Sequence, residues 1–223
     1  MNSLIYDEQA ILDYLAWLPD LEENEAYYLC LFCRKKYRPD VIATNDKTQL
    51  ARKGKSSKEY VMDTLLKWDM IDWGYPVDSL VAYLHPNPRC QVKAMRHLIK
   101  TGIDLVFNKA KGYSTPAQAM SSLQRSASRK PIMTFDLDGD TFKYNALNEI
   151  FNGGANECVN IIETRGGHHL LVEPKKATAI NRAWYNRIVE YGGESLDQKG
   201  DLMSPIPGTL QGGHKVKILD YVR

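Results

Sequence analysis

Three carboxylates follow an apolar run in the segment PIMTFDLDGDTF, residues 131–142. Ile132–Phe135 is predicted to be a buried strand, and Asp136 and Asp138 come directly after it. Because alternate residues of a strand point to one face, these two carboxylates can share a face. Two like charges so close repel each other unless a cation lies between them, and carboxylate oxygens suit Mg²⁺ and Mn²⁺. We therefore expect a divalent metal at Asp136 and Asp138, and an N-cap role for Asp140.

A histidine pair follows two glycines in IIETRGGHHLLV, residues 161–172. Gly166 and Gly167 permit a tight turn whose backbone can approach a ligand closely. His168 and His169 must point to opposite faces of the strand, so only one of them can face a given site. A lone strand histidine is more often structural than functional. The glycine turn and the nearby carboxylates favour a functional histidine here.

A third carboxylate would complete a two-metal site. The segment GESLDQKGDLMSPIPGTLQGG, residues 193–213, offers Asp197 and Asp201 ahead of a proline- and glycine-rich loop. Ordinary turn chemistry is the alternative interpretation of DQKGD, so the identity of a third ligand stays open at this point.

Charge, cysteine content and hydropathy bear on three classes of protein: nucleic-acid-binding proteins, proteins with cysteine-based metal sites and membrane proteins. The 223 residues carry a net charge of +2, which by itself does not indicate a nucleic-acid partner. Nine of the basic residues nevertheless fall between Arg34 and Lys58, where they either attract a polyanion or form a solvated loop. Cys30 and Cys33 form a CxxC without a second ligand pair, which predicts two buried thiols. No apolar run is long enough for a membrane span and no signal peptide is apparent, so we expect a cytoplasmic protein without a membrane partner.

Hydrophobic patterning predicts an α+β fold in two parts. Residues 1–130 are expected to form an N-terminal α/β lobe. Residues 131–223 give the order β-α-β-β-α-β with an extra hairpin, which is the RRM-like, split βαβ pattern. The first and third strands of that pattern lie adjacent, which brings the DxD segment near TRGGHH. The predicted helices are 3–18, 57–70, 91–101, 116–126, 141–151 and 177–191; the predicted strands are 26–32, 79–84, 132–135, 158–163, 169–172, 202–206 and 215–220, and 42–58 is predicted to be a loop.

These motifs in this order resemble the catalytic domain of the archaeo-eukaryotic primase superfamily, especially small primase-polymerases of phages and mobile elements. The resemblance covers residues 131–212 and rests on TFDLD, GGHH and SLD ahead of MSPIPGT. The apolar run after His169 favours it over His168 as the family's histidine. Gly167 stands where the family usually has Ser or Thr, and the third acid is Asp197, with Asp201 and Asp220 as alternatives.

The resemblance implies template-dependent nucleotidyl transfer, in a site in the cleft between the two lobes. Asp136, Asp138 and Asp197 would hold two Mg²⁺ or Mn²⁺ ions, and the substrates would be nucleoside triphosphates with a single-stranded DNA template or primer-template. A helicase or another replication protein would act in trans, in a bacterial host or for a phage. The residues expected to bind the triphosphate are His169, Arg165, Gly167 and Thr164, with Lys35, Lys36 and Arg89 as weaker candidates for phosphate or template.

Two other functions remain open. FDLDGD is similar to the first motif of haloacid-dehalogenase-type phosphatases, in which Asp136 would be a nucleophile and Asp138 a general acid. Only 87 residues follow Asp136, too few for the parallel sheet with crossover helices that this enzyme class needs. The second alternative is a non-catalytic RRM-like module that binds nucleic acid, although such modules expose aromatic side chains where this chain has acids.

Overall fold

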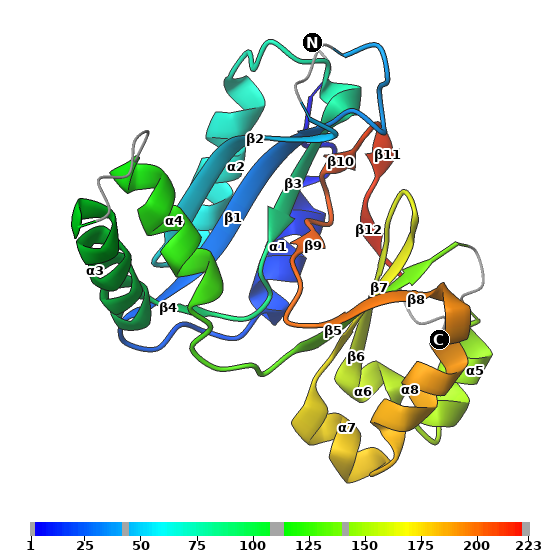
Figure 1. The fold of residues 1–223 in the computed structure, drawn as a ribbon. Coiled ribbons are helices and arrows are strands. Elements are labelled where there is room, and N and C mark those ends of the chain that lie inside the picture. Colours follow the sequence, from blue (N-terminus) through cyan, green and yellow to red (C-terminus); the bar gives the residue numbers. More distant parts are fainter. Residues whose placement is uncertain (1–2, 42–44, 108–113, 140–142, 220–223) are drawn as a thin grey trace.

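Two antiparallel sheets and the helices around them make up the structure, an α+β fold (Figure 1). The structure is a computed structural model, and it describes residues 3–41, 45–107, 114–139 and 143–219. Within this part of the chain, no helix is long and apolar enough to cross a membrane. The predicted N-cap Asp140 and the alternative third acid Asp220 lie outside the described residues.

The first sheet has the strand order β11-β10-β3-β1-β2, with β4 also pairing with β1 and β9 with β3. Strand β1 has nine buried residues among ten because helices α1 and α2 cover one face of the sheet, while α3 and α4 cover part of the other. The elements up to residue 130 are α1 (Glu8–Trp17), β1 (Glu25–Arg34), β2 (Lys47–Lys55), α2 (Lys58–Met70), η1 (Val77–Ser79), β3 (Leu80–Leu84), β4 (Arg89–Cys90), α3 (Gln91–Phe107) and α4 (Thr115–Arg125).

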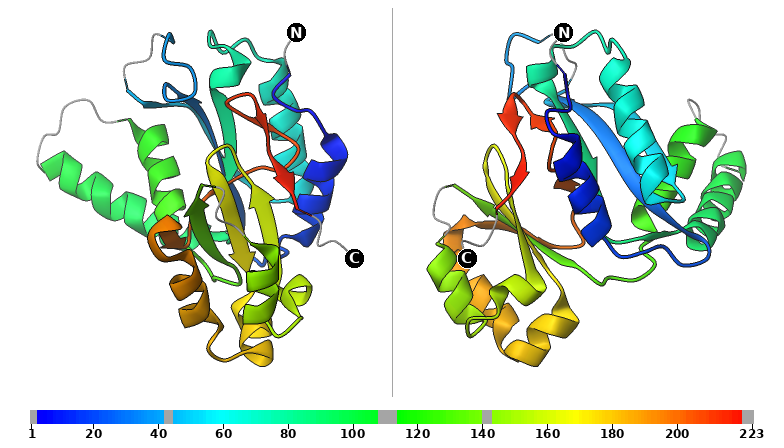
Figure 2. Two further views of the ribbon diagram at one scale, coloured as in Figure 1. Left: turned by 90° about the vertical axis from the view of Figure 1, so that its right-hand side faces the viewer. Right: turned by 180° about the vertical axis from the view of Figure 1, so that it is seen from behind.

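The second sheet has the order β12-β6-β7-β5-β8, and every pair in it is antiparallel. Helices α5 to α8 cover one of its faces (Figures 1 and 2), and the other face packs into the core of the first sheet. The elements are β5 (Met133–Asp138), α5 (Tyr144–Ile150), α6 (Ala155–Cys158), β6 (Val159–Glu163), β7 (Gly167–Val172), α7 (Pro174–Ile180), α8 (Trp184–Gly192), η2 (Gly193–Ser195), β8 (Leu196–Gly200), β9 (Ser204–Pro205), β10 (Leu210–Gln211), β11 (His214–Lys215) and β12 (Lys217–Ile218).

Several predicted elements are confirmed. The adjacency of the first and third strands of the second half is seen in the pairing of β5 with β7. The predicted helix 57–70 is α2, and its N-cap Ser57 accepts a hydrogen bond from the backbone amide of Tyr60. Cys30 and Cys33 are buried free thiols, and they belong to the cores on opposite faces of β1.

Other predictions were wrong. The predicted loop 42–58 contains β2, and the predicted helix 177–191 is two helices, α7 and α8. The strand expected at 202–206 is only two residues long and pairs with β3 of the first sheet, while β8 takes the place beside β5. The chain after β8 therefore crosses back to the first sheet before it returns to the second through β12.

Candidate active site

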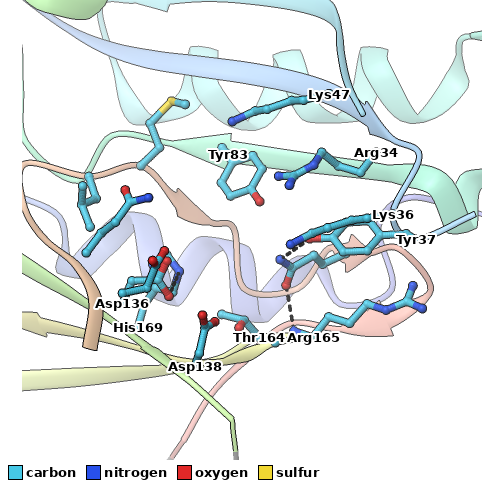
Figure 3. A pocket seen from close by; sticks show the side chains of 16 residues that line it. Arg34, Lys36, Tyr37, Lys47, Tyr83, Asp136, Asp138, Thr164, Arg165 and His169 are labelled. Carbon is cyan, nitrogen blue, oxygen red and sulfur yellow. Dashed lines mark hydrogen bonds and ion pairs between the residues drawn. The ribbon is translucent and has the colours of Figure 1, made fainter. Parts of the chain in front are cut away.

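Asp136 and Asp138 lie on one face of β5, as predicted, and both line a pocket of about 560 Å³ (Figure 3). The residues between and before them, Leu137 and Phe135, are buried on the opposite face against the helices. Strand alternation thus turns every apolar residue of this segment inward and both carboxylates toward the pocket.

Asp197 enters the same pocket from the neighbouring strand. β8 pairs with β5 so that Leu196 lies opposite Leu137, and the register shifts by a bulge between Asp136 and Leu137. Burial raises the pKa of Asp138, and the charges of Asp136 and Asp197 raise it further, while Lys36 and His169 oppose the shift. Asp138 is therefore close enough to both other carboxylates to be repelled by them, which is the condition that a bound cation relieves.

His169 lies directly opposite Asp136 in the β5–β7 pair and faces the same pocket. Its Nε2 is 3.2 Å from Oδ1 of Asp136, and its Nδ1 is 3.1 Å from the hydroxyl of Ser204. The ring is buried, so these two partners fix its orientation. His168 points to the other side of the strand, where it lines a separate hollow with Glu163 and His214.

The turn between β6 and β7 brings backbone close to the carboxylates. The amide of Gly139 donates to the carbonyl of Gly166 at 2.8 Å, and a Cβ on Gly167 would lie 2.0 Å from the carbonyl oxygen of Leu137. Only glycine fits at position 167, so this glycine serves the strand pairing rather than a ligand directly. The hydroxyl of Thr164 is likewise used in the turn, since it donates to the carbonyl of Gly167 at 3.0 Å.

Arg165 also lines the pocket. Its guanidinium stacks over the ring of Tyr37 at 4.8 Å and donates to the carbonyl of Gly212. Its backbone amide donates to the side chain of Gln211, which in turn donates to the hydroxyl of Tyr37 at 2.8 Å. These contacts join the glycine turn to the first sheet, as the dashed lines in Figure 3 indicate.

The wall opposite the carboxylates is cationic and comes from the first sheet. Arg34, Lys36 and Lys47 line it together with Tyr37 and Tyr83 (Figure 3). Burial lowers the pKa of Lys47, and the charges of Arg34 and Lys36 lower it further, so an anion placed here would relieve the repulsion. The sequence singled out only Lys36 of these three, although Arg34 and Lys47 belong to the same basic run.

Three residues named from the sequence lie elsewhere. Lys35 is exposed and does not line the pocket. Arg89 is 1% exposed and donates to both oxygens of Asp201, at 2.6 and 2.8 Å. Arg89 and Asp201 thus bind each other and neither lines the pocket, so the geometry does not favour Arg89 as a phosphate contact or Asp201 as a metal ligand. Asp197 is the third acid that the pocket contains.

The donor set suits a hard divalent cation. Two carboxylates from β5 and one from β8 supply the oxygen ligands that Mg²⁺ and Mn²⁺ take. As positioned without a cation, no three acidic, histidine or cysteine side chains among the described residues lie at metal-binding distances.

Comparisons with known proteins identify no relative: no protein-family model matches the chain, and no curated protein or solved structure resembles it significantly. What the chain does therefore has to be inferred from the residues of the pocket.

Proposed function

We propose that this protein is a metal-dependent nucleotidyltransferase of the primase-polymerase type. One observation carries the proposal. A single pocket has three carboxylates and a histidine on one wall and three cations on the other. An acidic wall suits divalent ions and a basic wall suits a polyphosphate, and nucleotidyl transfer needs the two side by side.

The strand order supports the same class. Among β5 to β8, the order β8-β5-β7-β6 places the fourth strand beside the first and the third between the first and second. This order supports a split βαβ, RRM-like sheet, in which the α5–α6 and α7–α8 pairs would be the two helical connections. In the proposed enzyme the cleft between this sheet and the first sheet is the active site.

In the proposed enzyme, different residues of the pocket would bind the triphosphate, bind the metal ions and position a metal-binding carboxylate. Arg34, Lys36 and Lys47 would bind the triphosphate through charge-assisted hydrogen bonds. Asp136, Asp138 and Asp197 would hold two divalent ions, which when bound supply activation of a 3′-hydroxyl and stabilisation of charge during in-line displacement. His169 would hold the carboxylate of Asp136 in place with its Nε2, and Ser204 would hold the ring.

A primer-extension assay tests the proposal. Wild-type protein is incubated with a DNA template, labelled nucleoside triphosphates and Mn²⁺ or Mg²⁺, with and without a primer. We expect metal-dependent products from the wild type and none from Asp136→Asn/Asp138→Asn. Calorimetric titration of Mn²⁺ should show binding to the wild type and not to the double variant, and equal binding by both proteins would contradict the metal site.

The two rival functions have less support from the geometry. A dehalogenase-type phosphatase places its nucleophile at the end of a parallel strand, whereas β5 is antiparallel to both of its neighbours. A covalent phosphoenzyme at Asp136, trapped with beryllofluoride, would restore that function. A non-catalytic RRM-like module would bind single-stranded DNA equally well with and without a divalent metal.

A further inference from the structure

Helix α3 has an apolar face that the described chain does not cover. α3 and α4 form a helical hairpin beside the first sheet, with α4 against β2 and α3 on its outer side (Figures 1 and 2). The inner side of α3 packs into the protein, since Ala94 is buried and Leu98 half-buried. The outer side presents five large apolar side chains that are between 41% and 81% exposed: Val92, Met95, Ile99, Ile103 and Phe107.

These five side chains form one continuous stripe. They follow one another at spacings of three, four, four and four residues, so each turn of the helix contributes one. They are five of the nine large hydrophobic side chains that are exposed among the described residues. Single exposed apolar residues are ordinary, but a contiguous apolar ridge roughly 22 Å long marks an interaction surface.

Cations border this stripe along one edge. Arg96 and Lys100 are exposed and lie beside it at 100° per residue, while Lys93 on the same edge donates to the carbonyl of Ala127 at 3.0 Å. The sequence of α3 contains one acid, Asp104. A surface that complements this face of α3 would therefore have an apolar seam with carboxylates along its edge.

We propose that the outer face of α3 is the docking site for an acidic amphipathic helix of a partner protein. A spacing of three and four residues is the seam that one helix offers to another. A second copy of this chain fits poorly as the partner. Whether the two α3 helices packed parallel or antiparallel, the second helix would offer a single acid to the cations of the first helix. A lipid surface also fits less well, because the exposed cations lie on one edge of the stripe rather than on both.

The direct test uses designed peptides and the full chain. The probe is a fluorescently labelled synthetic helix of about three heptads with leucine at the seam positions and glutamate along both edges. The matched control peptide has lysine in place of every glutamate. We expect saturable binding of the acidic peptide by fluorescence anisotropy and at least tenfold weaker binding of the basic one.

Three variants make the outcome decisive. Met95→Ser/Ile99→Ser should weaken binding of the acidic peptide at least tenfold, whereas Met70→Ser, at a still more exposed residue outside the stripe, should not change it. Arg96→Glu/Lys100→Glu should reverse the preference between the two peptides. Equal binding by all variants would overturn the proposal. The proposal would also be overturned if the acidic peptide does not bind and the protein instead self-associates or binds anionic vesicles. In that case Met95→Ser/Ile99→Ser would abolish the self-association or the vesicle binding.

Discussion

At the scale of single residues, one acid and one base of the pocket have shifted pKa values, although both residues remain solvent-exposed. Asp138 has a raised pKa because of burial and of its two acidic neighbours, and Lys47 has a lowered pKa because of burial and of Arg34 and Lys36. Each shift penalises the charged form of its own group. A cation at the acids and an anion at the bases would remove both penalties together, and a nucleoside triphosphate with divalent metal supplies both.

The histidine pair gives the first prediction. His169→Ala removes the partner of Asp136 and should slow nucleotide addition by roughly 10- to 150-fold, the effect of about 1.5–3 kcal/mol for a hydrogen bond to a charged group. His168→Ala should change the rate far less, because His168 lines the opposite side of the strand. The two variants are compared for extension rate at fixed Mn²⁺. A damaging His168→Ala with a nearly silent His169→Ala would place the functional face on the other side of β7.

The basic wall gives the second prediction. Lys47→Gln should weaken triphosphate binding by about 1.5–3 kcal/mol, or roughly 10- to 150-fold, because a charge-assisted contact is lost. Its affinity for Mn²⁺ alone should not fall, since Lys47 does not belong to the acidic wall. The control is Lys53→Gln, an exposed lysine of the same strand outside the pocket. Competition with a fluorescent triphosphate measures the triphosphate affinity of both variants. An equal loss of affinity in the two variants would mean that only the overall charge of the protein matters.

At the scale of elements, the approach of the β6–β7 turn to β5 sets the register of the site. Gly167→Ala should lower the free energy of unfolding by about 3 kcal/mol, at the upper end for overpacking, because the added Cβ meets backbone rather than a movable side chain. Gly166→Ala is the matched control, since the nearest atom to its Cβ would be a carboxylate oxygen at 3.7 Å. Urea unfolding gives the free energy of unfolding of both variants. A similar decrease in the two variants would contradict the close approach of the backbone to Gly167.

The elements that hold the acids were predictable because local pattern and tertiary environment agree there. Phe135 and Leu137 alternate with Asp136 and Asp138, so the strand and its polar face follow from the sequence alone. His169 was harder to assign because Leu171, on the same face, is also buried. The second sheet is covered by helices on one side and by the first sheet on the other, so neither face of β7 is polar throughout.

The missed elements are those whose identity depends on partners distant in the sequence. β2 is rich in lysine and mostly half-exposed, and its pairing with the buried β1 makes it a strand. β8, with the sequence LDQKG, is an exposed edge strand and has the composition of a turn. Arg34 and Lys47 were not assigned to the site for the same reason. They line one pocket with Asp136 only because the two sheets pack together in the folded protein.

At the scale of the whole molecule, a buried polar network joins the two sheets next to the pocket. The side chain of Asn87 bonds both backbone groups of Ile132, at 2.8 and 2.9 Å, just before β5 begins. It also donates to Asp201, which follows β8 and which Arg89 clamps. The loop after β3 thus fixes the start of β5 and the end of β8, the two strands that carry the acids. Removing one partner of such a buried ion pair typically costs about 3–5 kcal/mol.

His85 completes this network and makes the stability of the molecule depend on pH. Burial and the charge of Arg89 lower the pKa of His85 to about 3, so the ring is neutral near pH 7 and its Nδ1 accepts from Arg89 at 2.8 Å. Asp201 also has a lowered pKa: burial alone would raise it, but Arg89, Asn87 and His85 outweigh that cost. Both folded-state pKa values lie below their ordinary values, so both groups make the folded state less stable as the pH falls.

The last prediction separates these two contributions. Between about pH 6.5 and the lowered pKa of His85, the unfolded chain binds a proton at His85 that the folded chain does not, so the free energy of unfolding should fall by up to about 1.4 kcal/mol per pH unit. Asp201 should add to the loss only below about pH 4, its ordinary pKa. His85→Asn keeps an acceptor for Arg89 but cannot titrate, so urea unfolding should give a shallower slope than the wild type between pH 6.5 and 4.5, while the additional loss from Asp201 below about pH 4 should remain in both proteins. If both proteins have the same slope above pH 4.5, His85 is not held neutral by this network.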